Sequence, residues 1–137
     1  MPMYVIKTEV NDLVAKAFEF TRQKTMYGGK NIAKGDLVFI FASETEGGPG
    51  LVARGIVVSA AAIPRKIGGA RQTPRVSVTV KRTALAKRRL GRIELKQFRN
   101  WTDGRPETEL NFKFYRQATN KIGGISGEVA EFLGEYF

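Results

Sequence analysis

Aromatic and directional hydrogen-bonding side chains stand together in FKFYRQATN, residues 112–120. Here Tyr115 is followed directly by Arg116 and Gln117. An aromatic ring can hold a planar base by stacking, while guanidinium and amide groups can pair with the hydrogen-bonding edge of that base. The same residues would be ordinary on an exposed edge strand, so this stretch by itself leaves both interpretations open.

Other side chains could take part in recognition. Trp101, the only tryptophan, could stack against a base or simply fill a core. Glu9 ends an expected strand, where side chains commonly reach into a site, although an ion pair with a neighbouring cation is the simpler interpretation. Glu44 and Glu46 are spaced like a carboxylate pair, but their glycine-rich surroundings indicate a solvated hairpin tip.

The composition argues against most catalytic chemistry. The chain has no cysteine and no histidine, which excludes disulfides, thiolate nucleophiles, Cys-based metal sites and a Ser-His-Asp triad. No phosphate-binding glycine loop and no acidic cluster of the EF-hand or two-metal type is present. We therefore expect a binding protein without cofactor or metal, the alternative being an enzyme that relies on carboxylates, Lys or Tyr.

Positive charge is concentrated in the middle of the sequence. The net charge is +10; no acidic residue occurs between Gly47 and Ile93, while the rest of the chain is close to neutral. Such a stretch favours a polyanion, above all nucleic acid, over a solvated face that serves solubility alone. An anionic membrane or acidic protein is disfavoured because no basic amphipathic helix is evident. The expected phosphate contacts are Arg65, Lys66, Arg71, Arg75, Lys81, Arg82, Lys87, Arg88, Arg89 and Arg92.

Hydrophobic periodicity predicts mostly strands. LVFIFAS is a continuous apolar run, typical of a strand buried on both faces, whereas RVSVTVKRTAL alternates and predicts a half-buried strand. Gly55 interrupts a long strand and indicates a bulge. The strands are expected at residues 3–8, 37–43, 51–61, 75–85, around 93–98 and at 110–117.

Helices are expected near the two ends of the chain. Asn11 is a plausible N-cap for residues 12–20, and Ser126 for residues 127–137. Five or six strands with peripheral helices predict an α+β, mainly β fold, a small mixed or antiparallel β-barrel. We expect a single domain over residues 1–137.

The order of these motifs resembles a known family. The segments YVIKTE, KGDLVFIFAS, PGLVARGIVVSA, GRIELKQF and FKFYRQATNKIGGISGEVAEFL follow one another as in the EVE domain, a member of the PUA-like group of small β-barrels. The resemblance covers nearly the whole chain and rests on the ordered set of short motifs. Val10 departs from the pattern, since the family often has proline there.

The resemblance implies a nucleic-acid-binding protein that reads a modified base, such as methylated or hydroxymethylated cytosine, flipped into a pocket. DNA is favoured; an RNA-binding or RNA-modification-associated PUA-like protein is the alternative. With Trp101 added, the expected base pocket consists of Lys7, Thr8, Glu9, Phe41, Ser43, Trp101, Tyr115, Arg116 and Gln117.

The cellular setting is predicted only in outline. No apolar run approaches the roughly 20 residues that span a bilayer, and the N-terminal residues do not resemble a secretory signal. We therefore expect a cytoplasmic protein without membrane association. A separate nuclease or modification enzyme is a candidate partner, and the sequence leaves the oligomeric state open.

Overall fold

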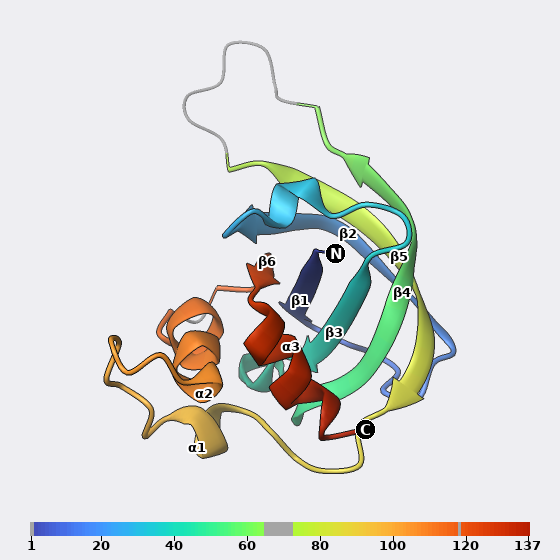
Figure 1. The fold of residues 1–137 in the computed structure, drawn as a ribbon. Helices are drawn as coiled ribbons and strands as arrows, with labels where there is room; N and C mark the ends of the chain where they lie inside the picture. The colour runs from blue at the N-terminus through green and yellow to red at the C-terminus, as the bar shows by residue number, and fades with distance from the viewer. Residues whose placement is uncertain (1, 65–72, 118) are drawn as a thin grey trace.

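Six strands form a closed barrel in the order β1-β3-β4-β5-β2-β6 (Figure 1). The computed structural model describes residues 2–64, 73–117 and 119–137. β1 pairs in parallel with β3 and antiparallel with β6, β2 runs parallel to β6, and the remaining pairs are antiparallel. The small mixed barrel predicted from the sequence is thus confirmed. The strands are β1 (Met3–Thr8), β2 (Ala17–Met26), β3 (Leu37–Ala42), β4 (Gly50–Ala62), β5 (Arg75–Leu85) and β6 (Lys121–Ile125).

Short helices surround the barrel. Those of the second half of the chain pack against the outer face of β1 and β3 (Figure 1). Among the residues that the structure describes, no helix is both long enough and apolar enough to cross a membrane. The helical segments are the 3₁₀ turns η1 (Gly29–Asn31) and η2 (Glu44–Glu46), the α-helices α1 (Arg92–Leu95), α2 (Pro106–Leu110) and α3 (Gly127–Gly134), and the π-helical turn η3 (Asn111–Tyr115).

β1 and β3 are buried on both faces because they separate two apolar cores. Ile6 and Ile40 point into the barrel, while Val5 and Phe39 point outward against α2, η3 and α3. Alternate residues of a strand face opposite sides, so a strand between two cores must be apolar throughout. The continuous run LVFIFA at β3 meets this requirement, as the sequence predicted.

The predicted features of β4 and β5 are also confirmed. The valines of β5 that were expected to face inward lie in the barrel core. The pairing of β4 with β5 shifts register between Arg54 and Gly55. A Cβ atom at Gly55 would lie 2.5 Å from the carbonyl oxygen of Lys81, so the bulge places two backbones in contact and requires glycine there.

The helix expected at residues 12–20 is wrong. The Asp12 side chain instead accepts a hydrogen bond from the Val14 N–H at 3.0 Å, which forms a local turn. β2 begins at Ala17, and Phe18 and Phe20 both point into the barrel. The two phenylalanines have the period of a strand, and barrel packing decides the local structure.

The strands expected at 93–98 and 110–117 are also wrong, because both regions are helical. Pro106 is suited to the first turn of α2, where a missing N–H costs nothing. Glu109 and Lys113 form an ion pair across one helical turn, at 3.2 Å. The true last strand is β6, which the sequence analysis did not predict because Gly123 and Gly124 looked like a break. A Cβ at Gly124 would meet the Tyr27 carbonyl oxygen at 2.6 Å, so close backbone packing explains this glycine.

Candidate nucleic-acid interface

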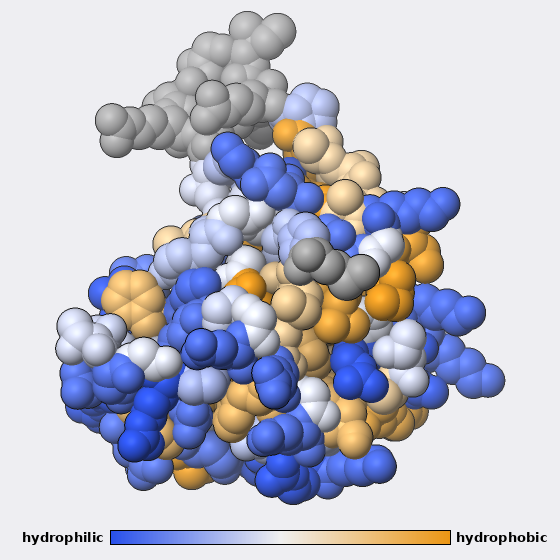
Figure 2. Space-filling model, in the orientation of Figure 1, coloured by the Kyte–Doolittle hydropathy of each residue, from blue (hydrophilic) through white to orange (hydrophobic). Residues whose placement is uncertain are grey.

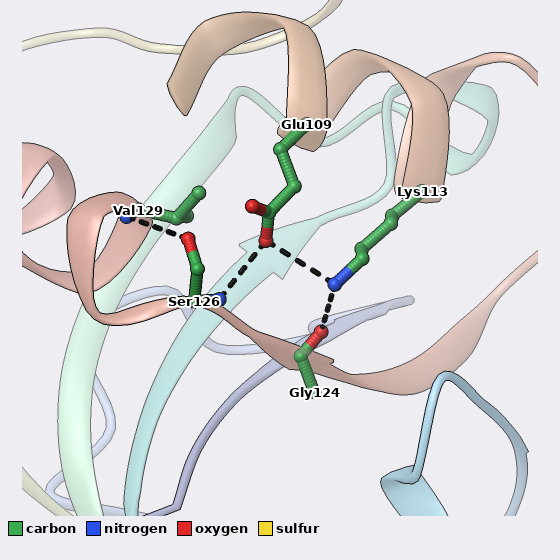
Figure 3. A network of polar contacts seen from close by, with 5 residues as sticks. All are labelled: Glu109, Lys113, Gly124, Ser126 and Val129. Carbon is green, nitrogen blue, oxygen red and sulfur yellow. Dashed lines mark hydrogen bonds and ion pairs between the residues drawn. The ribbon is translucent and has the colours of Figure 1, made fainter. Parts of the chain in front are cut away.

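A polar network fastens α2 and η3 to the barrel (Figure 3). The Glu109 carboxylate accepts hydrogen bonds from the Ser126 N–H at 2.9 Å and from the Lys113 ammonium at 3.2 Å. Lys113 also donates to the Gly124 carbonyl at 2.8 Å, and the Ser126 hydroxyl caps α3 at Val129. Burial by itself would raise the pKa of Glu109, but these donors outweigh it and lower the pKa. The network fixes the segment that carries Tyr115 and Arg116.

Two buried lysines bind backbone carbonyls of η3. Lys7 and Lys121 are paired across β1 and β6, and their exposed fractions are 0% and 1%. The Lys7 ammonium donates to the Phe114 carbonyl at 2.9 Å, and that of Lys121 to the Lys113 carbonyl at 2.7 Å. The last carbonyls of a helix have no donors within the helix, so the lysines supply them.

The surroundings of these two lysines disfavour their charged form. Burial lowers the pKa of Lys121 to about 8, and the nearby Lys7 and Arg116 add to the effect. Burial also lowers the pKa of Lys7, although the Glu44 carboxylate opposes this. The two ammonium groups are therefore kept in place by the carbonyls they bind, not by ion pairing.

Tyr115 is fixed at its hydroxyl and at its ring. The hydroxyl donates to Glu44 Oε1 at 2.9 Å, and the ring packs edge-on against Phe41 with 6.3 Å between ring centres. Burial and the Glu44 carboxylate raise the pKa of Tyr115. The second Glu44 oxygen accepts the Arg92 N–H at 2.6 Å, so this carboxylate joins η2, η3 and α1. Glu44 and Glu46 were both expected at a solvated hairpin tip. This is correct for Glu46, which is exposed, but wrong for Glu44, which is partly buried.

A first cavity, called here the aromatic–basic cleft, opens beside Tyr115. It has a volume of about 310 Å³. The Arg116 guanidinium lies 3.9 Å from the centre of the Phe112 ring. Trp101 packs edge-on against Phe112 at 5.5 Å and is 43% exposed. The cleft is lined by Arg92, Lys96, Arg99, Trp101, Asn111, Tyr115 and Arg116.

The cleft is strongly cationic. Within the described parts of the chain, none of its four basic side chains forms an ion pair with a carboxylate. Arg92 donates to the Thr45 hydroxyl at 3.3 Å and Arg99 to the Lys96 carbonyl at 3.0 Å, so both make contacts that leave their charge in place. Hydrophilic residues gather over α1 and α2 at the lower left of the space-filling view (Figure 2). Such a site attracts anions.

A second cavity, called here the polar hollow, lies near the end of β1 and has a volume of about 260 Å³. It combines neutral amide and hydroxyl groups with cations. Arg75 donates to the Arg22 carbonyl at 2.7 Å, and Gln23 Nε2 donates to the Thr21 carbonyl at 3.0 Å. Its lining consists of Thr8, Arg22, Gln23, Lys24, Arg75, Thr119 and Asn120.

An irregularity in β2 shapes the polar hollow. The pairing of β2 with β5 shifts register between Phe20 and Gln23, and Arg22 has a φ of 51°. A left-handed backbone is uncommon for a residue other than glycine and turns the strand locally. The Ser77 hydroxyl accepts the Arg22 N–H at 2.9 Å and stabilises this conformation.

The 3₁₀ turn η2 connects the cleft with the hollow. Tyr115 and Arg116 line the cleft, whereas Asn120 lines the hollow. η2 contacts both sides, since Glu44 binds the Tyr115 hydroxyl and Glu46 accepts from the Asn120 amide at 3.1 Å. The residue stretch that was singled out in the sequence therefore borders two cavities.

The nine expected pocket residues divide accordingly. Thr8 lines the hollow, and the expected stacking and guanidinium groups of Trp101, Tyr115 and Arg116 line the cleft. Glu9 and Gln117 are exposed and line neither cavity. Lys7, Phe41 and Ser43 are buried and line neither cavity. The Ser43 hydroxyl has no hydrogen-bond partner among the described residues.

The expected phosphate contacts are spread over the molecule. Arg92 lines the cleft and Arg75 the hollow. Lys81 and Arg82 lie at the far end of β5, about 20 Å from Arg75 at roughly 3.3 Å per residue. Lys87, Arg88 and Arg89 are exposed near the C-terminal residues, while Arg65, Lys66 and Arg71 lie outside the described residues.

Several lining residues were not predicted. Lys96 and Arg99 precede Trp101 by a few positions, so their sequence proximity to the only tryptophan was an available signal. Gln23 and its neighbours gave no signal, because the expected helix ended at residue 20 and no strand was expected at residues 21–26. Thr119 and Asn120 lie within three positions of Gln117, the last expected pocket residue. Within the described parts of the chain, no three acidic side chains gather where they could hold a metal ion.

Comparison with known proteins supports the fold. No protein-family model and no curated protein matches the chain. The chain is similar to the crystal structure of human THYN1 in complex with DNA containing 5-methylcytosine, at 19% identity and a TM-score of 0.66, over 99% of this chain and 98% of that one. It is also similar to the DUF55 domain of human thymocyte nuclear protein 1, at 16% identity and a TM-score of 0.64, over 96% of this chain and 95% of that one.

A bacterial structure shows the same likeness. A protein from Pseudomonas putida is 16% identical with a TM-score of 0.63, and the match covers 98% of each chain. At these identities the likeness establishes the fold. The small closed β-barrel that was expected is thereby confirmed.

The buried lysine pair predicts an unusual dependence of stability on pH. The pKa of Lys121 is about 8 in the folded protein against its usual 10.5. Between these values the unfolded chain binds more protons at Lys121 than the folded chain, so the contribution of Lys121 to stability rises with pH. The free energy of unfolding of the wild type, minus that of Lys121→Met, should increase by about 2 to 3 kcal/mol between pH 7.5 and 10.5. Urea unfolding measures this, with Lys34→Met, an exposed site, as control. Parallel pH profiles of wild type and Lys121→Met would contradict it.

The Glu109 network predicts the opposite dependence. Glu109→Gln removes a charged acceptor of two donors and should lower the free energy of unfolding by about 1 to 3 kcal/mol at pH 7. Because the pKa of Glu109 is lowered, this difference is present above the usual pKa of a glutamate and disappears as the pH falls through the lowered one. The matched control is Glu131→Gln on the exposed side of α3. Equal effects of the two substitutions at pH 7 would show that the network is not stabilising.

Proposed function

We propose that this protein binds DNA and reads a modified base, methylated or hydroxymethylated cytosine, that is displaced from the duplex. The observation that carries the proposal is the likeness, over nearly the whole chain, to a structure solved in complex with DNA containing 5-methylcytosine. The two cavities that flank residues 115–120 support it, because they provide the hydrogen-bonding, aromatic and cationic groups that such binding requires.

The polar hollow suits the displaced base. Reading a base edge requires hydrogen-bond donors and acceptors at fixed positions. The hollow provides the amides of Gln23 and Asn120 and the hydroxyls of Thr8 and Thr119. Guanidinium planes can stack on a base, and Arg22 and Arg75 both line the hollow, where the Arg75 guanidinium donates to the Arg22 carbonyl. Displacing a base costs a few kcal/mol, which hydrogen bonds and stacking of this kind can offset.

The cations around the hollow suit the phosphates on either side of that base. The hollow is lined by three cations, Arg22, Lys24 and Arg75, together with its neutral amides and hydroxyls. Phosphate contacts supply affinity without reading sequence, whereas contacts to the base supply discrimination. Binding to any duplex should therefore weaken steeply with salt, while the preference for the modified base should persist.

Loss of a neutral reading group tests this division. Gln23→Leu should weaken binding to a duplex with one 5-methylcytosine about tenfold, because a good base contact contributes about 1 to 3 kcal/mol of discrimination. Binding to the unmodified duplex, which depends on phosphates, should change less than twofold. Fluorescence anisotropy with methylated, hydroxymethylated and plain duplexes and a matched RNA, at two salt concentrations, measures both effects.

Lys34→Gln is the control, since Lys34 is exposed and lines neither cavity. Unfolding in urea verifies that Gln23→Leu keeps its fold. An unchanged preference in Gln23→Leu would refute the assignment of the base to the hollow. Tighter binding of the RNA than of every duplex would refute the choice of DNA.

A further inference from the structure

We propose that the aromatic–basic cleft is a second nucleotide subsite, which holds a nucleotide flanking the base that is read in the polar hollow. The inference rests on the proposed function and deepens it. In this arrangement the cleft binds one nucleotide through its phosphate and the face of its base, and it does not read the base edge. The two cavities would then hold neighbouring parts of the same DNA.

The chemistry of the cleft differs from that of the hollow. Four cations and two aromatic rings line it, with Asn111 as the only neutral amide. Asn111 is buried, and its amide donates to the Phe98 carbonyl at 3.0 Å, whereas Gln23 and Asn120 in the hollow are partly exposed. Cations bind phosphate and aromatic faces stack on any base, so the cleft has affinity for a nucleotide without selectivity for its sequence.

The stacking surfaces are fixed before any ligand binds. Tyr115 is held by Glu44 and Phe41. The Arg116 guanidinium lies 3.9 Å from the centre of the Phe112 ring, against which Trp101 packs edge-on. Side chains that are already ordered lose little conformational entropy on binding, which favours affinity. Trp101 remains 43% exposed, so part of its surface is available to a base.

Size and position favour a single flanking nucleotide. The volume of about 310 Å³ lies at the lower end of the range of about 300 to 1,000 Å³ typical of small-ligand sites. The 3₁₀ turn η2 links the two cavities, because Glu44 binds Tyr115 of the cleft and Glu46 binds Asn120 of the hollow. A strand whose displaced base enters the hollow therefore has its next nucleotides close to the cleft.

The only tryptophan of the chain reports on the cleft directly. A duplex with one 5-methylcytosine should change the fluorescence of Trp101, with the same midpoint as the anisotropy of the labelled DNA. Trp101→Ala should weaken binding of methylated and plain duplexes alike, by about tenfold, because stacking contributes in that range. Trp101→Phe, which keeps an aromatic face, should recover most of the affinity.

The cations are tested by their salt dependence. Lys96 and Arg99 are exposed, so the double variant Lys96→Gln with Arg99→Gln should fold normally. Each lost phosphate contact reduces the slope of log K against log salt by about 0.9, so a reduction of about 2 is expected. The preference for the methylated duplex should stay as in the wild type. The matched control is Lys16→Gln with Lys34→Gln, two exposed lysines that line neither cavity.

The outcomes separate the two proposals. Unchanged Trp101 fluorescence at saturating methylated DNA, or a wild-type salt slope in the Lys96 and Arg99 double variant, would overturn the second subsite. The proposed function would still stand if Gln23→Leu lost the preference for the methylated duplex. Failure of every duplex to bind at low salt would overturn both proposals.

Discussion

The position of η3, which carries Tyr115, depends on two ammonium groups buried between the barrel and this helical turn. Lys7 and Lys121 donate to the carbonyls at the end of η3, where the helix itself has no donors left. On the opposite side, Glu109 and Lys113 join α2 and η3 to β6 and α3. Hydrogen bonds from the ammonium groups of Lys7, Lys113 and Lys121 therefore hold η3 to the barrel. Burial lowers the pKa of both lysines and makes their charge costly, and the hydrogen bonds to the two carbonyls offset part of this cost.

The same constraint explains why one sequence stretch borders two cavities. η3 ends at Tyr115, and β6 begins at Lys121, which is paired with Lys7. Tyr115 and Arg116 line the aromatic–basic cleft, and Thr119 and Asn120 line the polar hollow. The chemistry is divided as well: the cleft carries rings and cations, the hollow carries amides, hydroxyls and cations. A division of this kind suits a ligand that is partly read and partly only held, as DNA with a displaced base is.

The parts of the fold that the sequence predicts are those where packing and local pattern agree. β3 reads as a doubly buried strand because it separates two cores, and Ser126 caps α3 through its hydroxyl, as expected. Prediction failed where tertiary contacts decided the structure. Phe18 and Phe20 belong to a strand only because the barrel closes over them. Residues 110–117 looked like a strand, and their helical form depends on buried lysines over a hundred positions earlier or at the start of β6. The expected pocket residues were assigned to a single cavity, whereas those that line a cavity are divided between two.

The most direct test of this account is backbone and side-chain amide NMR of the labelled protein, titrated with a duplex that carries one 5-methylcytosine. The account predicts that the largest shifts fall on the side-chain amides of Gln23 and Asn120 and on the indole N–H of Trp101, with the amides of α3 unaffected. Shifts confined to the exposed basic residues Lys81, Lys87, Arg88 and Arg89, with these three groups unchanged at saturation, would contradict it. DNA would then bind the charged surface and enter neither cavity.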